Sequence, residues 1–324
     1  MRQRKLTGIV VLALAAAIAA GGALAQQFPT KPIRLIVPFA PGGATDYMAR
    51  TIGQKMSESM GQAVVVENKP GANAILGTDL VAKSPPDGHT MFLCAFGHAT
   101  NPYLVAKLPY DTVKDLAPVS LLVTGPLLLV AHPSVPATNL KELVAHLKAN
   151  PGKLNYASGG IGSSQHFATE LLISMTGTKM THIAYKGTAP AYIDLLSGTT
   201  SLMFDNMLIA LPQVKAGKLK AIAISTAQRS SQAPEVPTVA ESGLPGFETG
   251  IWHGFLTTGG SPAPAIERLH REIVKALESP EVKSGFVSRG LNPVGSTPAE
   301  FDGFIRNEMA KWSKVIKEAG IKAE

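Results

Sequence analysis

The sequence predicts an α/β fold of two lobes, each built on a mixed, mostly parallel sheet flanked by helices. Short apolar runs alternate with amphipathic stretches along the chain, an order typical of parallel sheets covered by helices. Two of these runs lead through a glycine-rich turn straight into a helix pattern, once near the start of the chain and once near its middle. The chain has 324 residues, which favours two domains over one.

The first glycine-rich turn is Pro41-Gly-Gly43, which follows an apolar run and precedes a helix that we expect to begin at Thr45 or Asp46. Apolar residues then recur at every fourth position over Met48–Met60, which places them on one helical face. The glycines allow a tight bend or a close approach of the backbone. Because the first N–H groups of a helix lack backbone partners, the turn can hold an anion, although it can equally be a plain capped turn.

The second unit of this kind begins with a predicted strand at 154–157, continues through the turn Ser158-Gly-Gly-Ile-Gly-Ser-Ser164 and enters a helix at about Gln165. A related unit follows at 181–190, where a proline suits the first turn of a helix. Ligands of open α/β sheets bind at loops that follow the carboxyl ends of strands. These turns, together with Gly97-His98 after the strand expected at 91–95, are therefore candidate ligand contacts.

The other apolar segments complete the two sheets. An apolar stretch from Val119 to Val130, broken at 124–126, predicts two strands joined by the crossing at which the chain leaves the first lobe. A loop rich in Pro, Gly and Glu at 233–250 precedes a strand at 252–257, which predicts the return to that lobe. Further strands are expected at 64–66, 201–206 and 219–224, and helices at 75–83, 140–149 and in two amphipathic stretches after Ile266 and after Pro298.

Composition and charge argue against a nucleic-acid partner. The formal net charge of +7 falls to +4 without residues 1–25, and Lys and Arg form no run that would follow a nucleic-acid backbone. Aromatic residues make up 6% of the chain, too few for a base-stacking surface. The single cysteine, Cys94, lies in an apolar run and can form neither an internal disulfide nor a cysteine-rich metal site.

Residues 1–25 have the form of a secretory signal peptide. Arg2, Arg4 and Lys5 precede a short apolar segment, and Ala23-Leu-Ala25 is a small-residue cleavage site before Gln26. The apolar segment is too short for a confident membrane span, and no later run qualifies as one. We expect cleavage near Ala25 and Gln26 and a mature protein that is soluble in the periplasm.

The motifs of common enzyme classes are missing from the sequence. No Gly-x-Ser-x-Gly elbow is present, and the histidines show no zinc-binding spacing. The segment Gly160-x-Gly-x-x-Gln165 resembles a dinucleotide fingerprint but lacks the third glycine, and the next strand ends in Lys186 where an acid should hold the ribose. Asp46 and Asp205 could form an acid–base pair, although nothing in the sequence brings them together. We therefore expect a binding protein rather than an enzyme, with no metal and no cofactor.

Several segments spread over the mature chain share one resemblance. They are Val37-Pro-Phe-Ala-Pro-Gly-Gly-Ala-Thr-Asp46 with Arg50, Val66-Glu-Asn-Lys-Pro-Gly-Ala-Asn73, Ser84-Pro-Pro-Asp-Gly88, Tyr156-Ala-Ser-Gly-Gly-Ile-Gly-Ser-Ser164, Tyr185-Lys-Gly187, Phe204-Asp-Asn206 and Pro237-Thr-Val-Ala-Glu241. In this order they resemble the Bug family, the periplasmic receptors of tripartite tricarboxylate transporters. Each segment alone is a weak signal, and their number and order make the resemblance specific.

The resemblance implies a two-lobed periplasmic binding protein, type II-like, whose chain crosses twice between the lobes and whose ligand cleft lies between them. Residues 26–125 and 250–324 would form lobe 1, and residues 126–249 would form lobe 2. Such a receptor captures a small carboxylic acid and delivers it to a membrane transporter, whose subunits are transient partners. We expect the receptor itself to be a monomer.

The resemblance also implies the ligand site. Backbone groups and ordered water at the 39–46 turn of lobe 1 would hold the carboxylate, and hydroxyl groups with Lys186 would complete the site from lobe 2. The predicted ligand contacts are Phe39, Ala40, Pro41, Gly42, Gly43, Asp46, Asn73, Ala74, Gly97, His98, Ser158, Ser163, Ser164, His166, Tyr185, Lys186, Gly187 and Asp205.

The identity of the ligand and the use made of its binding stay open at this point. Backbone groups and hydroxyl-rich loops suit a citrate, a dicarboxylate, an aromatic acid or a neutral amide such as nicotinamide. The alternatives to a transport receptor are a periplasmic enzyme acting on a small carboxylate and a sensor that passes ligand binding to a signalling protein.

Overall fold

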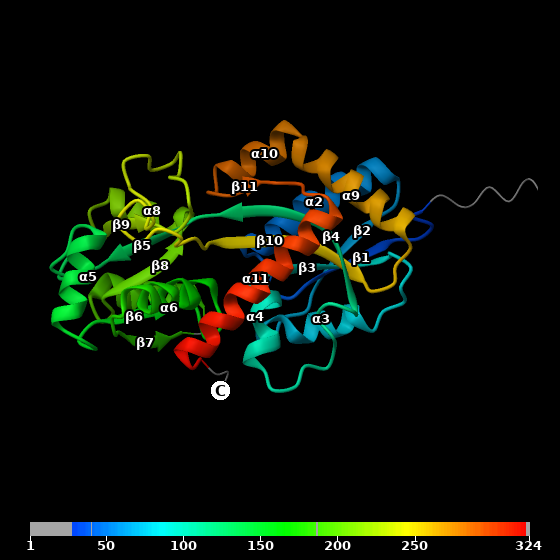
Figure 1. Ribbon diagram of the computed structural model, residues 1–324. Helices are drawn as coiled ribbons and strands as arrows, with labels where there is room; N and C mark the ends of the chain where they lie inside the picture. Colours follow the sequence, from blue (N-terminus) through cyan, green and yellow to red (C-terminus); the bar gives the residue numbers. More distant parts are fainter. Residues whose placement is uncertain (1–27, 40, 186, 322–324) are drawn as a thin grey trace, which may run out of the picture.

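The computed structural model describes residues 28–39, 41–185 and 187–321, so the predicted signal peptide lies outside the described residues. Two sheets flanked by helices lie side by side along the molecule (Figure 1). We call the part around the first sheet lobe 1 and the part around the second sheet lobe 2. Within the three described ranges, no helix is both long enough and apolar enough to cross a membrane.

The sheet of lobe 1 has six strands. Their spatial order is β11 (Asn292–Pro293), β4 (Leu116–Gly125), β10 (Ile251–Thr258), β3 (Thr90–Ala95), β1 (Ile33–Val37) and β2 (Val64–Asn68). β1 pairs in parallel with β2 and with β3, whereas β10 is antiparallel to both of its neighbours, β3 and β4. The carboxyl ends of β1, β2 and β3 therefore lie at one edge of the sheet, where the first glycine-rich turn follows β1.

Helices cover both faces of this sheet. One face carries α2 (Ala44–Met60), α9 (Ala263–Glu278) and α10 (Pro280–Val287); the other carries α3 (Ile75–Ala82), α4 (Gly97–Leu104) and α11 (Pro298–Ala319). The two-residue period of β1 explains this arrangement, because Leu35 packs in the core on the α2 side and Ile36 in the core on the α11 side. The apolar stripe predicted for α2 is confirmed, since Met48, Ile52 and Met56 are fully buried.

Lobe 2 has five strands in the order β7 (Thr181–Ala184), β6 (Asn155–Ser158), β8 (Leu202–Asn206), β5 (Leu127–Ala131) and β9 (Lys220–Ile224). β6 is parallel to β7 and β8, and β5 is antiparallel to β8 and β9. The helices α5 (Leu140–Ala149) and α6 (Ser164–Thr176) contribute to the core on one face, and α7 (Thr188–Ser197) and α8 (Met207–Lys215) to the core on the other. The carboxyl ends of β6, β7 and β8 consequently meet at one edge of this sheet.

The chain passes between the lobes along two neighbouring segments. β4 ends at Gly125, and after Pro126 the chain continues as β5 in the other sheet; it returns to lobe 1 as β10. The predicted break in the apolar stretch at 124–126 is thus confirmed, as is the irregular loop at 233–250. The two segments approach closely, because a Cβ atom on Gly250 would collide with the carbonyl oxygen of Gly125.

The C-terminal helix joins the two lobes. α11 runs along the junction between them in Figure 1 and packs against α4 of lobe 1 and α6 of lobe 2. The ring of Trp312 on α11 lies 5.0 Å from that of Phe96 in lobe 1 and 5.2 Å from that of Phe167 in lobe 2. These aromatic contacts form one continuous apolar cluster across the junction.

Five elements differ from the sequence-based expectation. The pattern of the sequence did not indicate α4, α8, α10, the short 3-10 helix η1 (Ala72–Ala74) or the two-residue strand β11. Both α4 and α8 contain a proline inside the helix, Pro102 and Pro212 respectively, which argues against a helix when the sequence is read alone. The start of α2 at Ala44 also lies one residue before the predicted range.

Candidate functional site

The first glycine-rich turn links β1 to α2 and is open to solvent. Pro41, Gly42 and Gly43 are exposed, and Gly42 has a left-handed backbone with φ +85° and no atom within 4 Å of an added Cβ. Gly43 is the N-cap of α2, has φ −83° and provides no capping side chain. Thr45 and Asp46 both lie inside α2, so neither is its N-cap residue. The first N–H groups of α2 are left without a capping side chain next to an open turn.

Asp46, in the first turn of α2, connects both sides of the glycine-rich turn. Its Oδ2 accepts hydrogen bonds from the N–H of Gly42 (3.0 Å) and from Nε of Arg50 (2.9 Å). Its Oδ1 accepts one from Nδ2 of Asn68 (2.9 Å), and the same Nδ2 donates to the carbonyl oxygen of Phe39 (3.1 Å). Asp46 thus holds the turn in shape.

The charge of Asp46 is balanced inside lobe 1. The hydrogen bond from Arg50 is the largest cause that lowers the pKa of Asp46 to about 2, with further help from Gly42 and Asn68, although burial acts in the opposite direction. Asp46 is therefore ionised at neutral pH. Because the Arg50 guanidinium neutralises this carboxylate, a second anion can approach the turn without facing an unpaired negative charge.

The hydroxyl groups of the second turn are engaged within lobe 2. Ser158 Oγ, buried at the end of β6, lies 2.7 Å from Nε2 of His182. Ser163 is the N-cap of α6 and accepts the N–H of His166 (3.3 Å), while Nδ1 of His166 accepts the N–H of Gly162 (3.3 Å). These three predicted contacts, Ser158, Ser163 and His166, fix the conformation of the turn. Ser164, the first residue of α6, is buried beside them.

A stack of rings lies behind this turn. The ring of His182 lies 4.7 Å from that of Tyr156 and 4.1 Å from that of His166, with nearly parallel planes. Burial lowers the pKa of His182 to about 4 and that of His166 to about 3. Both imidazoles are therefore neutral at neutral pH, which leaves Nδ1 of His166 free to accept its hydrogen bond. In the part of the chain that the structure describes, no three His, Cys, Asp or Glu side chains gather as a metal site requires.

Asp205 ends β8 and is buried, with 1% of its surface exposed. Its Oδ1 accepts a hydrogen bond from Nε2 of Gln165 (3.1 Å), and that nitrogen also lies 3.4 Å from Oγ1 of Thr188. Burial raises the pKa of Asp205 to about 6, against the effect of the Gln165 hydrogen bond. The hydrogen bonds of Asp46 and Asp205 share no residue, so the structure gives no support to an acid–base pair between them.

Asn73 brings the two lobes into contact. Ala72, Asn73 and Ala74 all have left-handed φ values, between 46° and 74°, and a pair of hydrogen bonds of 2.8 and 2.9 Å holds Asn73 to Asn101. A Cβ atom on Gly162 of lobe 2 would lie 2.9 Å from Nδ2 of Asn73, and one on Gly97 would lie 3.2 Å from it. Asn73, Gly97 and the second turn are therefore neighbours at the boundary between the lobes.

His98 lies apart from the glycine-rich turns. It is buried and lines a small cavity together with Leu256 of β10 and Ile305 of α11. Burial lowers the pKa of His98 to about 4, so the ring is neutral. Since this places His98 on the side of α4 that faces α11 and β10, we leave it out of the site proposed below.

The remaining predicted contacts follow β7. The hydroxyl of Tyr185 donates to Asp194 on α7 (2.6 Å), and this contact ties up the polar end of the side chain. The N–H of Gly187 donates to the carbonyl oxygen of Gly159 (3.1 Å), which continues the pairing of β6 and β7 beyond the strands. The predicted contacts Ala40 and Lys186 lie outside the described residues.

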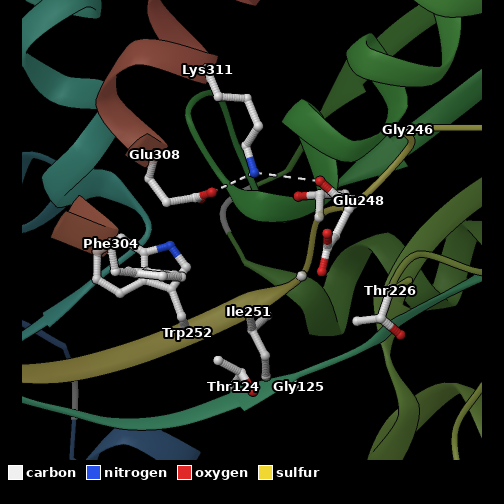
Figure 2. A pocket seen from close by; sticks show the side chains of 12 residues that line it. Thr124, Gly125, Thr226, Gly246, Glu248, Ile251, Trp252, Phe304, Glu308 and Lys311 are labelled. Carbon is white, nitrogen blue, oxygen red and sulfur yellow. Dashed lines mark hydrogen bonds and ion pairs between the residues drawn. The ribbon is translucent and has the colours of Figure 1, made fainter. Parts of the chain in front are cut away.

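A cavity of about 410 Å³ lies at the crossing between the lobes, apart from both turns. Figure 2 shows Glu308 and Lys311 of α11 pointing toward one another and toward the linker that carries Glu248. Lys311 pairs with Glu308, whose Oε2 accepts a hydrogen bond from Nε1 of Trp312 (2.8 Å). Because Lys311 pairs with Glu308 and no predicted contact lines the cavity, we assign the cavity to the crossing between the lobes and not to the ligand site.

Two partly exposed polar residues next to the second turn were missed by the sequence analysis. Gln165 and Thr188 are partly exposed and start α6 and α7, where their side chains meet. The available signal was their position, since each directly follows a glycine-rich turn at the carboxyl end of a strand. Asn68 was also missed, although it ends β2 at the same edge as the first turn.

Comparison with known proteins gives one consistent result. Residues 48–321 match the family described as TctC, the tripartite tricarboxylate transporter family receptor. The chain is 38% identical to Protein BugT of Bordetella pertussis over 324 residues, with 99% of each chain covered. A solved structure of R. palustris Rpa4515 with adipate is 35% identical, with a TM-score of 0.81 and coverage of 91% of this chain and 99% of that one. MatC from Rhodopseudomonas palustris with bound malate is 33% identical, with a TM-score of 0.77 and coverage of 89% and 100%.

Proposed function

The chain belongs to the family of tripartite tricarboxylate transporter receptors, and from this premise we propose that it captures a small carboxylic acid between its lobes and delivers it to a transporter of this type. The family consists of solute-binding receptors of transporters, not enzymes, and has the periplasmic binding protein fold. Two solved structures similar to this chain hold adipate and malate, which are small carboxylic acids.

The observation that carries the proposal is the open turn at the start of α2. Its exposed backbone, its uncapped helix start and the neutralised Asp46 favour a carboxylate at this position. The ligand would lie between this turn and the ends of β6, β7 and β8 in lobe 2. A carboxylate accepts hydrogen bonds from backbone N–H groups more strongly than a neutral group does.

The proposal also covers the boundaries of the two lobes, the location of the protein in the cell and its partners. Lobe 1 would comprise residues 26–125 and 250–324, and lobe 2 residues 126–249, in agreement with the membership of the two sheets. The signal peptide would be cleaved near Ala25 and Gln26. The mature protein would be a monomer in the periplasm. The transporter subunits would be transient partners.

The first experiment is a thermal-shift screen of the mature protein against mono-, di- and tricarboxylates. An acid at a hundredfold excess over its Kd should add about 2.7 kcal/mol to the free energy of unfolding. For a chain of this size that corresponds to an increase in Tm of a few degrees. Amines and sugars of similar size serve as controls and should leave Tm unchanged. Stabilisation by these neutral and cationic compounds alone would contradict the proposal.

Closure of the lobes around the acid gives the second test. Because turns on opposite lobes contact one small ligand only when the cleft is narrow, a saturating acid should lower the radius of gyration measured by solution scattering. The measurement is repeated with a carboxylate that gave no thermal shift, which should leave the scattering profile unchanged. An identical profile with and without the binding acid would indicate a rigid site.

A further inference from the structure

We infer that Gln165 and Thr188 form the lobe 2 half of the ligand site and select an acid whose far end carries an uncharged group with a hydrogen-bond donor, such as a carboxamide or a hydroxyl. The inference rests on the proposed function, because it assumes that the near end of the ligand is a carboxylate at the first turn. It adds the class of ligand that lobe 2 accepts.

The two side chains lie next to Gly159, and we call the space left by its missing side chain the notch. A Cβ atom added to Gly159 would lie 3.4 Å from Oγ1 of Thr188, 3.5 Å from Oε1 of Gln165 and 3.6 Å from the carbonyl carbon of Gly187. Gly159 does not have a left-handed backbone, so no conformational demand requires a glycine there. The absent side chain instead leaves room, and all four residues are partly exposed at the edge where β6 and β7 end.

The orientation of the Gln165 amide follows from its partner. Nε2 of Gln165 donates to Oδ1 of Asp205 (3.1 Å), and an ionised carboxylate can only accept. The NH2 group must therefore face Asp205, and Oε1 is left on the side of Gly159. Asp205 is buried and acts through Gln165, which makes it a positioning residue rather than a ligand contact.

The notch offers one acceptor next to one donor. Among the described residues, no group donates a hydrogen bond to Oε1 of Gln165. Oγ1 of Thr188 accepts a hydrogen bond from Nε2 of Gln165 (3.4 Å). The hydroxyl proton of Thr188 is therefore available for donation to a ligand. A carboxamide or a hydroxyl satisfies both atoms, whereas an ionised carboxylate would place its oxygens against Oε1 with no proton between them.

The charges around the notch also favour an uncharged group over a second carboxylate at the far end of the ligand. The residues that border the notch are uncharged, and the Gln165 amide donates a hydrogen bond to the buried carboxylate of Asp205. Its carboxylate disfavours a second negative charge on the ligand. Lys186 directly precedes Gly187 and lies outside the described residues, so its contribution is measured by a variant.

The test compares three acids of equal length at each of two lengths: adipate, its monoamide and hexanoate, and succinate, its monoamide and butyrate. At the length that binds best, isothermal titration of the mature protein should give a Kd for the monoamide about tenfold lower than for the diacid or the alkyl acid. Gln165→Met keeps the size of the side chain but removes the amide, and it should abolish this tenfold advantage. The alkyl acid should bind Gln165→Met and the wild type within about threefold.

Two further variants complete the experiment. Gln54→Met, on the exposed side of α2, is the matched control and should leave all affinities unchanged. Thr188→Val should also weaken the monoamide selectively. The inference would be overturned if the diacid bound most tightly and its affinity advantage over the monoamide disappeared in Lys186→Met. It would also be overturned if the preference for the monoamide survived in Gln165→Met. If no acid of either length binds, the proposed function falls as well; if all three acids bind equally, only the inference falls.

Discussion

Replacing Gly42 with valine should abolish carboxylate binding and leave a folded protein. Gly42 has φ +85°, a conformation that costs an L-residue about 1–2 kcal/mol and a β-branched residue more. Relieving this strain moves the N–H of Gly42 away from Asp46 and shifts the turn that precedes the helix start. We expect the Kd for the acid found by screening to rise more than about a hundredfold, because binding depends on backbone groups held in one geometry. Isothermal titration and urea unfolding measure the two effects.

Gly61 provides the matched control at the other end of the same helix. It also has a left-handed backbone, with φ +67°, and nothing within 4 Å of an added Cβ. Gly61→Val should therefore reduce the free energy of unfolding by a similar amount and leave the Kd unchanged. If Gly42→Val binds the acid as tightly as Gly61→Val does, the turn before α2 is only a connection and the ligand is held elsewhere.

The fold was largely predictable because it depends on the pattern of apolar residues. The helix expected at 140–149 coincides with α5, whose apolar face is regular and whose N-cap, Asn139, accepts the N–H of Glu142. The helix α10 was missed because only two of its residues, Val282 and Phe286, are buried, which is too few to show a helical period. The strand β11 has only two residues and depends on its partner β4, which no local pattern reveals.

The site was predictable only in part. The positions of the two glycine-rich turns follow from strands that end where helices begin, which is local information. The partners of polar side chains are not local: Ser158 meets His182, which is 24 residues away, and uses its hydroxyl there. His98 is a second example of a non-local contact. Its position after β3 predicted that it faces the ligand cleft, whereas the structure places it next to Ile305 of α11. The sequence pattern gives Gln165 as a helix start and as the last position of an incomplete dinucleotide motif, and neither predicts its contact with Asp205.

The substitution Asp46→Asn should give the second large effect, a loss of folding stability that depends on pH. The pKa of Asp46 is about 2 in the folded protein against 3.8 for a free aspartate, so the ionised form is the one that folding favours. Its contribution to stability, about 2 kcal/mol, is complete above the unfolded pKa and is lost as pH falls through the folded value. The asparagine side chain would keep one acceptor but would lose the ion pair with Arg50, and the turn between Phe39 and Gly43 would loosen.

We therefore expect Asp46→Asn to lower the free energy of unfolding by about 2 kcal/mol at neutral pH, with a difference from wild type that shrinks as pH falls from about 4 toward 2. Urea unfolding at several pH values measures this, and the variant should also bind the acid more weakly. Asp302→Asn is the control, because Arg306 pairs with Asp302 at the same spacing but both side chains are exposed, at 56% and 41%. Exposed pairs contribute little, so this variant should leave the free energy of unfolding nearly unchanged. Equal effects of the two variants would mean that Asp46 stabilises the turn no more than a surface ion pair does.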